Sequence, residues 1–280
     1  MTFQQKLNSI VEKNNSLLCI GLDSQFEKIP SHIKTQKNPI FAFNKSIIDA
    51  TNNLVCAYKP NSAFYEAQGV EGIRQLKMTM DYLKETYSEI PIILDAKRAD
   101  IGNTNLGYIK FAFGYLGADA ITLHWYVGRE GLKPFLDLKD KCMFIYCRSS
   151  NTGAGEFQDL QISGKHLYQI IAEHVVKKWN YNNNCGLIFG ATYPTELEIV
   201  RRITGDGFPL LIPGIGAQGG DVEKTVKAGI DNEGLNAIIN SSRGILFVSS
   251  GADFADKARD EAKKLQKIIN NFRNNPEVSS

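Results

Sequence analysis

Short apolar runs alternate along the chain with longer stretches in which apolar residues recur every three or four positions. Eight runs are rich in β-branched or aliphatic residues: 17–22, 54–58, 91–94, 118–123, 142–147, 185–189, 209–212 and 236–239. Apolar runs of this length predict parallel strands that are buried on both faces. The three- and four-residue spacing between them predicts amphipathic crossover helices at 40–51, 64–87, 105–115, 166–179, 195–203 and 221–228.

Eight strand-then-helix units predict an α/β protein with a closed (β/α)₈ barrel, the TIM barrel. An open, doubly wound sheet is the alternative. The chain has 280 residues, and barrels of this kind commonly reach ~250 residues as one domain. Because no linker or shift in composition interrupts the pattern, we expect residues 1–280 to form a single domain.

Composition narrows the class of protein. Lys and Arg number 32 against 30 Asp and Glu, which gives a net charge of +2 and no support for nucleic-acid binding. No run approaches the ~20 apolar residues of a membrane span, so we expect no membrane insertion. The five cysteines include no Cys-x-x-Cys pair and lie mostly in apolar runs, which indicates reduced thiols and a cytoplasmic location.

The ends of the predicted strands carry polar and ionisable residues. They include Asp23, Lys59, Asp95, Lys97, Ser150 and Arg243. Enzymes on this fold place their chemistry where strands end and the following loops begin. We therefore expect these side chains to meet at one face of the barrel.

The most informative stretch is DAKRADIGNT at 95–104, directly after an apolar run. Side chains two positions apart in a strand point the same way, so Asp95 and Lys97 are both expected to face the barrel mouth. Asp100 and Thr104 would lie in the following loop. A structural ion pair at a strand end is the alternative interpretation of the bare Asp-x-Lys spacing.

The ten-residue string resembles the signature of the orotidine 5′-phosphate decarboxylase family, in its longer bacterial branch. The resemblance extends over most of the chain, through YKPNSAFYE at 58–66, RSSN at 148–151, PGIGAQGG at 213–220 and SSRG at 241–244. It implies decarboxylation of orotidine 5′-monophosphate to uridine 5′-monophosphate, the last step of UMP biosynthesis.

The resemblance implies four catalytic residues: Lys59, Asp95, Lys97 and Asp100. Loss of carbon dioxide from C6 leaves a carbanion that the ring cannot delocalise, so a fixed ammonium group must stabilise it and then protonate it. Lys97 is the candidate for that group. Whether Asp95 repels the departing carboxylate or orients the lysines is left open.

The resemblance also implies a set of substrate-binding residues: Asp23, Ile101, Thr104, Ser150, Pro213, Gln218 and Arg243. Asp23 is expected at a ribose hydroxyl and Ser150 at the pyrimidine amide edge, although either residue could simply stabilise a turn. Arg243 and Gln218 are expected at the phosphate. The Gly-rich segment 214–219 formally matches a dinucleotide-binding fingerprint, but Asn240 and Ser241 stand near the place where that fingerprint needs an acid.

We expect no metal and no organic cofactor, because no two of His124, His166 and His174 have the His-x-x-x-His spacing of a metal site. The resemblance implies a homodimer with shared active sites, in which Asp100, Ile101 and Thr104 come from the partner. Two alternatives remain open. One is a metal-dependent sugar-phosphate decarboxylase of the same suprafamily, and the other is a non-catalytic barrel scaffold.

Overall fold

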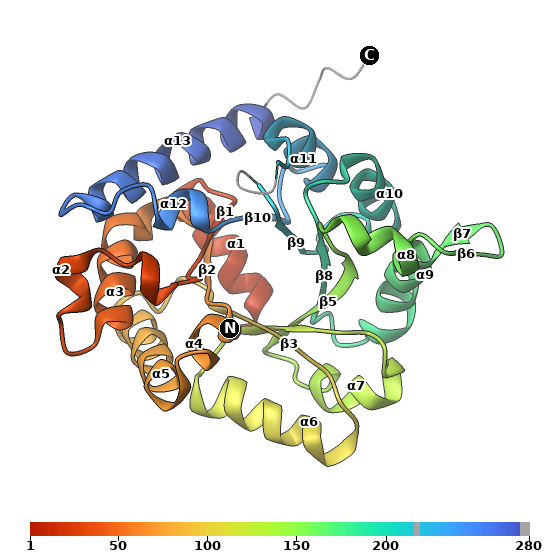
Figure 1. The fold of residues 1–280 in the computed structure, drawn as a ribbon. Coiled ribbons are helices and arrows are strands. Elements are labelled where there is room, and N and C mark those ends of the chain that lie inside the picture. The colour runs from red at the N-terminus through yellow and green to blue at the C-terminus, as the bar shows by residue number, and fades with distance from the viewer. Residues whose placement is uncertain (216–218, 275–280) are drawn as a thin grey trace.

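Eight parallel strands form a ring at the centre of the molecule (Figure 1). The computed structural model describes residues 1–215 and 219–274. The strands are β1 (Leu18–Gly21), β2 (Ala57–Lys59), β3 (Ile93–Arg98), β4 (Ala120–Leu123), β5 (Cys142–Arg148), β8 (Cys185–Phe189), β9 (Leu210–Pro213) and β10 (Ala237–Ser241). Their order is β2-β1-β10-β9-β8-β5-β4-β3. Bridges from Tyr58 to Ile92 and from Asn61 to Asp95 join the two ends of this order. The closed ring confirms the predicted barrel, and the doubly wound sheet is wrong.

The helices lie around the ring on its outer side, except α1, which lies across one end of it (Figure 1). They are α1 (Phe3–Asn14), α2 (Ser31–Lys34), α3 (Pro39–Thr51), α4 (Ser62–Glu66), α5 (Gly69–Thr86), α6 (Gly102–Ile109), α7 (Gly128–Leu136), α8 (Gly155–Gln158), α9 (Leu167–His174), α10 (Pro194–Thr204), α11 (Val222–Gly229), α12 (Arg243–Leu246) and α13 (Phe254–Asn274). The expected helix at 64–87 is divided between α4 and α5, where Gly69 adopts a φ of +61°. The expected helices at 105–115 and 166–179 each end in a π-helical segment, Lys110–Tyr115 and Val175–Trp179.

Helix α1 lies across the barrel in the view of Figure 1, at the end opposite the strands' carboxyl termini. Its N-terminus is fixed by a capping box in which Thr2 and Gln5 satisfy each other's backbone N–H groups. Phe3 then packs edge-on against Phe144 of β5, with ring centroids 5.6 Å apart. This contact covers the end of the barrel where the strands begin. The end where the strands finish is left for the site.

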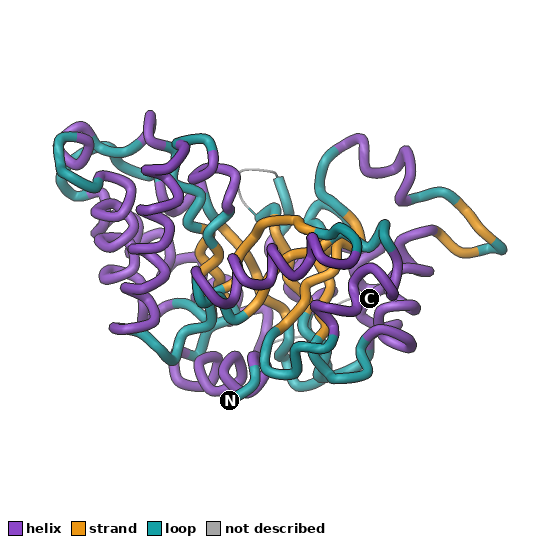
Figure 2. The backbone as a smooth tube through the Cα atoms, turned by 90° about the horizontal axis from the view of Figure 1, so that it is seen from below, coloured by secondary structure: helices purple, strands orange, loops and turns teal. Residues whose placement is uncertain are grey.

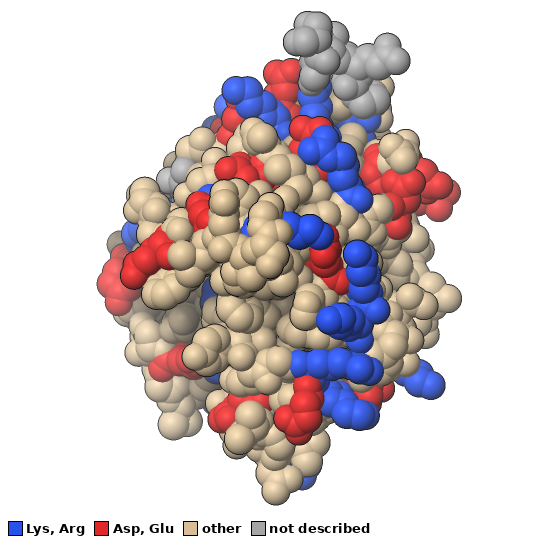
Figure 3. Space-filling view, turned by 90° about the vertical axis from the view of Figure 1, so that its right-hand side faces the viewer, with Lys and Arg blue, Asp and Glu red and all other residues tan. Residues whose placement is uncertain are grey.

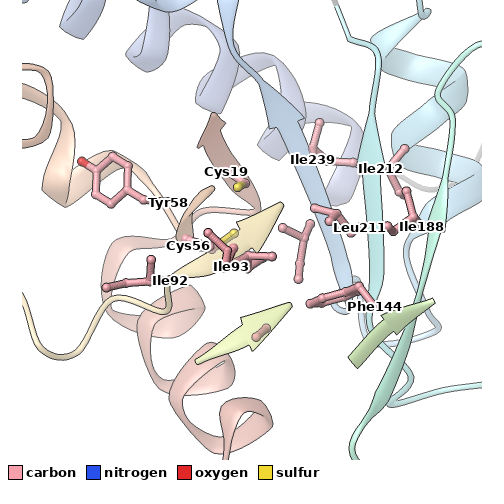
Figure 4. Packing of buried hydrophobic residues seen from close by; sticks show 14 of the residues in the cluster. Cys19, Cys56, Tyr58, Ile92, Ile93, Phe144, Ile188, Leu211, Ile212 and Ile239 are labelled. Carbon is pink, nitrogen blue, oxygen red and sulfur yellow. The ribbon is translucent and has the colours of Figure 1, made fainter. Parts of the chain in front are cut away.

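Apolar side chains from all eight strands fill the space around the ring, and Figure 4 shows part of this cluster. Tyr58 is an exception, because its ring points outward from β2 and its hydroxyl lies 2.8 Å from that of Thr51 in α3. The five cysteines are buried free thiols. The strands are therefore covered on both faces, as their continuous apolar character indicates.

A two-stranded hairpin projects from the body of the barrel (Figure 2). It comprises β6 (Gln161–Ile162) and β7 (Lys165–His166), joined by Ser163 and Gly164, which both have positive φ. This hairpin was not predicted from the sequence, because two-residue strands are too short to produce an apolar pattern.

Charges of both signs occupy the face shown in Figure 3, where basic side chains form a row bordered by acidic ones. Such mixing agrees with the net charge of +2. No helix in the described part of the chain combines the length and apolar character that a membrane crossing requires.

Candidate active site

A pocket with a volume of 170 Å³ opens at the carboxyl ends of the barrel strands. Residues from β1, β2, β3, β5, β9, β10 and the loops after them line it: Asp23, Lys59, Asn61, Asp95, Lys97, Tyr146, Ser150, Pro213, Gly214, Ile215, Asn240, Ser242 and Arg243. Seven of these residues belong to the sets predicted from the sequence. The barrel thus brings together side chains that lie as much as 220 positions apart, from Asp23 to Arg243.

The carboxylate of Asp95 is the centre of the polar network in this pocket. Its Oδ1 accepts hydrogen bonds from the Nζ of Lys97 at 2.8 Å and from the hydroxyl of Thr122 at 2.9 Å. Its Oδ2 accepts from the Nζ of Lys59 at 3.1 Å and from the amide of Asn61 at 3.2 Å. Four donors match the roughly four lone-pair sites of a carboxylate, so this side chain is fixed in direction.

Burial and charge act in opposite directions on Asp95. Burial by itself would raise its pKa, but the ammonium groups of Lys59 and Lys97 outweigh that effect and hold the pKa well below its usual range. Lys59 is almost completely buried. Burial would lower the pKa of Lys59, but Asp23 and Asp95 together raise it above its ordinary value. Both groups are therefore charged at neutral pH.

Asp23 completes a row of alternating charges. Its Oδ1 lies 3.8 Å from the Nζ of Lys59, which is beyond hydrogen-bond distance. The same oxygen is buried and accepts no hydrogen bond from any described residue. A buried acceptor without a donor is costly in a folded protein, so its position on the pocket wall indicates a ligand that donates there.

Asp95 and Lys97 do face the same pocket, but not for the reason that strand alternation suggests. Leu94 and Arg98 of β3 pair with Ile121 and Leu123 of β4. Strand β3 therefore advances by four residues while β4 advances by two. Lys97 lies in this irregular stretch and has a φ of +48°. The period-two argument was wrong in this detail, because a bulge interrupts the alternation.

Ser150 is held on the pocket wall by its backbone. Its carbonyl accepts a hydrogen bond from the hydroxyl of Thr192 at 3.1 Å. A Cβ added to Gly190 would lie 2.7 Å from the Cα of Ser150, so the two backbones approach more closely than a side chain allows. Two positions before Ser150, the guanidinium group of Arg148 stacks 3.6 Å from the centre of the Tyr193 ring and pairs with Asp159 at 2.9 Å.

The loops after β9 and β10 form the end of the pocket remote from Asp95. Gly220 donates its N–H to the carbonyl of Gly214, which closes the base of the β9 loop. Arg243 begins α12, and its exposed side chain lines the pocket beside Ile215. Gln218, the other residue predicted at this end, lies outside the described residues.

Asp100, Ile101 and Thr104 are not among the described residues that line the pocket. The Oδ1 of Asp100 accepts a hydrogen bond from the N–H of Ile101 at 2.7 Å. Ile101 is 63% exposed, and Thr104 is exposed as well. Within one chain, these three predicted residues do not join the pocket around Asp95.

The sequence analysis missed several residues of the site, notably Asn61, Tyr146, Asn240 and Ser242. Asn61 follows Lys59 at a strand end, and Ser242 precedes Arg243, so their positions could have indicated them. Tyr146 lies within an apolar run and carried no such signal. Its ring stacks on that of His124, with centroids 5.3 Å apart, and lies 5.8 Å from the Nζ of Lys97.

No group of three or more metal-ligating side chains occurs in the part of the chain that the structure describes.

Comparisons with known proteins identify relatives along nearly the whole chain. A model of the orotidine 5′-phosphate decarboxylase / HUMPS family matches residues 16–258. The orotidine 5′-phosphate decarboxylase of Cellvibrio japonicus is 47% identical over 96% of this chain and 98% of its own length. The structure of Leishmania donovani OMP decarboxylase covers 98% of this chain and 99% of its own, with a TM-score of 0.84 and 36% identity. The structure of Leishmania donovani UMP synthase covers 98% of this chain with a TM-score of 0.86 and 37% identity, and this chain spans 57% of that longer protein.

The low pKa of Asp95 predicts a specific dependence of stability on pH. Below the pKa of the unfolded state, about 3.9, unfolded chains bind a proton at Asp95 that the folded protein does not, so stability is lost as pH falls. The variant Asp95→Asn lacks this loss. Between pH 5.5 and pH 3.5 the difference in unfolding free energy between wild type and variant should therefore shift by about 0.7 kcal/mol against the wild type.

Urea titrations at the two pH values measure this shift. Asp140→Asn is the matched control, because Asp140 is 67% exposed and lies 3.6 Å from its partner Lys141, so its replacement should leave the difference constant. A constant difference for Asp95→Asn as well would contradict the assigned charge of Asp95.

Proposed function

The chain belongs to the orotidine 5′-phosphate decarboxylase family, and we propose that its pocket converts orotidine 5′-monophosphate into uridine 5′-monophosphate and carbon dioxide. The observation that carries this proposal is the row Asp23, Lys59, Asp95 and Lys97, which supplies a fixed ammonium group beside a buried carboxylate. Relatives with this activity match 96% of the chain at 47% identity. The reaction completes UMP biosynthesis.

Lys97 supplies the charge and the proton in this mechanism. The bond between C6 and the carboxylate breaks, carbon dioxide leaves, and the electron pair remains on C6 in the plane of the ring. The ammonium group of Lys97 stabilises that carbanion and then transfers a proton to it, and solvent restores the proton to lysine. The side chain of Lys97 is 36% exposed, whereas that of Lys59 is 4% exposed, so Lys97 is the lysine with access to a substrate.

Asp95 acts mainly by orienting the two lysines. Its Oδ1 holds Lys97 and its Oδ2 holds Lys59, and further donors occupy both oxygens. A carboxylate whose lone pairs are all engaged within the protein is screened from a neighbouring carboxylate by the bound ammonium groups. Orientation therefore accounts for its contacts more directly than repulsion does.

The remaining pocket residues match the other parts of the nucleotide. The buried Oδ1 of Asp23, which accepts no hydrogen bond from the described residues, accepts one from a ribose hydroxyl. Ser150 lies on the wall beside the pyrimidine, and Pro213 continues that wall toward the phosphate end. Arg243 binds the phosphate dianion, and Gln218, which lies outside the described residues, is the second side chain that we assign to the phosphate.

The direct test is to mix purified protein with orotidine monophosphate and follow the loss of its ultraviolet absorbance. We expect turnover to UMP, and we expect prolonged chelation to leave the rate unchanged, because Lys97 supplies the positive charge and no cofactor takes part. No turnover would reject the function. A loss on chelation that magnesium reverses would favour the metal-dependent sugar-phosphate decarboxylase instead.

We further propose that residues 1–280 act as one domain in the cytoplasm. The support for one domain is a single hydrophobic cluster that includes residues from Phe3 to Ile269. Support for the location comes from the five free, buried thiols, which suit a reducing compartment.

Replacement of Arg243 should weaken catalysis through the phosphate. Binding energy from a remote group can organise the reacting centre. Arg243→Ala should therefore lower kcat/KM by an amount that corresponds to about 1.5 to 3 kcal/mol of activation free energy, the scale of a charge-assisted hydrogen bond. Arg202→Ala is the control, since Arg202 pairs with Glu198 on the outside of α10 and is 65% exposed. Equal kcat/KM values for the two variants would show that the phosphate binds elsewhere.

We propose that the active enzyme is a homodimer in which Asp100, Ile101 and Thr104 complete the site of the partner. Asp100 and Ile101 lead into α6, which carries Thr104, and this segment packs beside α7, where Asn105 donates to the carbonyl of Gly131. Exposed apolar side chains on these neighbouring elements include Ile101, Leu106 and Tyr126. An apolar surface next to an unfinished site suits an interface between two copies.

A shared site predicts that two inactive variants restore each other. A hybrid of Lys97→Ala and Asp100→Ala subunits has one site with both lesions and one with neither. Co-refolding at equal amounts should recover about a quarter of wild-type activity, because half the dimers are hybrids with one intact site.

The matched control mixes Lys59→Ala with Lys97→Ala. Both residues line the same pocket of one chain, so their hybrids contain no intact site and should stay inactive. If the Asp100 hybrids, verified with tagged subunits, are equally inactive, Asp100 acts within its own chain.

A further inference from the structure

Thr122 is a buried polar residue in an otherwise apolar strand. Its neighbours in β4 are Ala120, Ile121 and Leu123, and the side chain of Thr122 has no exposure to solvent. Valine has nearly the same shape and would suit such a strand without a hydroxyl group. A buried hydroxyl therefore calls for a specific hydrogen-bonding role.

The position of Thr122 opposite the β3 bulge defines that role. Because β3 uses three residues between its two pairing points with β4, the segment from Asp95 to Lys97 faces Thr122. The hydroxyl of Thr122 accepts a hydrogen bond from the backbone N–H of Lys97 at 2.9 Å. It donates its own proton to the Oδ1 of Asp95, also at 2.9 Å.

These two bonds act on the least favourable backbone conformation of the site. Lys97 has a φ of +48°, a left-handed conformation that costs a residue with a side chain about 1 to 2 kcal/mol. The hydroxyl bond holds the N–H of Lys97 in this conformation, and the second bond holds the carboxylate that receives the Nζ of the same residue. Thr122 thus fixes both the start and the end of the Lys97 side chain.

We propose that Thr122 is a positioning residue for decarboxylation, which directs the ammonium group of Lys97 toward C6 through its bonds to the Lys97 backbone and Asp95. The proposal rests on the proposed function of the same pocket. Thr122 does not line the pocket among the described residues, so it acts through Lys97 rather than on the substrate.

Thr122→Val removes the hydroxyl and keeps the shape, whereas Thr122→Ser keeps the hydroxyl. A misplacement of a reacting group by about 1 Å can cost ~100-fold in rate, so we expect Thr122→Val to lower kcat by about 10- to 100-fold. Affinity for UMP, measured by calorimetry, should stay within about threefold of wild type, because the groups that contact the nucleotide are unchanged. Thr122→Ser should recover kcat to within about threefold of wild type, since one hydroxyl can make both bonds.

Thr51→Val is the control for loss of a buried threonine hydroxyl as such. Thr51 lies in α3, is fully buried and bonds the hydroxyl of Tyr58 on the outer side of the barrel. This variant should lose stability without loss of kcat. A folded Thr122→Val protein with wild-type kcat, or a Thr122→Ser protein as slow as Thr122→Val, would overturn the proposal.

Hydrogen exchange of the Lys97 amide tests the positioning without reference to activity. In labelled protein, this amide of β3 should exchange at least about tenfold faster in Thr122→Val than in wild type or Thr122→Ser, with the amides of β4 unchanged. Equal rates in all three proteins would overturn the proposal even if the wild type decarboxylates orotidine monophosphate. An inactive wild type would reject the proposed function, and the exchange rates would still decide whether Thr122 holds Lys97.

Discussion

Two lysine ammonium groups share one buried carboxylate, and the arrangement of the barrel mouth depends on this shared charge. The carboxylate of Asp95 holds Lys97 on one oxygen and Lys59 on the other. Lys59 is buried and would be costly without this carboxylate, and Asp95 would be costly without the two ammonium groups. Because the charges alternate from Asp23 onward, each group makes its neighbour's ionised form favourable. The row can therefore present a positive charge at a fixed place in the pocket.

The barrel makes this arrangement possible by bringing the ends of separate strands to one edge. The bridge between Asn61 and Asp95 joins the two ends of the strand order, and Asn61 also donates to the Asp95 carboxylate. Closure of the ring and orientation of the charge cluster thus occur at the same point. The tight contact between Gly190 and Ser150 fixes another part of the pocket wall. The charged side and the uncharged side of the pocket are both set by backbone contacts, which are more rigid than contacts between long side chains.

The barrel could be predicted from the sequence because each strand is a continuous apolar run bounded by polar residues, and because crossover helices separate the runs. The residues at the strand ends followed from the same pattern, and the structure places Asp23, Lys59, Asp95, Lys97, Ser150, Pro213 and Arg243 around one pocket. The bulge in β3 could not be predicted, since the apolar run ends at Leu94 while the strand continues to Arg98. Thr122 was missed for the opposite reason. It lies inside an apolar run, where a single threonine is usually a core residue, and its role depends on a backbone irregularity in another strand.

The central claim is that Lys97 stabilises and protonates a carbanion at C6. Microscopic reversibility requires that the same ammonium group, once deprotonated, can remove the C6 proton of the product. Uridine monophosphate incubated with the wild-type protein in deuterated water should therefore gain deuterium at C6, detected by mass spectrometry, and the Lys97→Ala variant should produce no gain above the uncatalysed rate. Equal incorporation with the wild type and Lys97→Ala would contradict the account, because another group would then exchange the proton at C6.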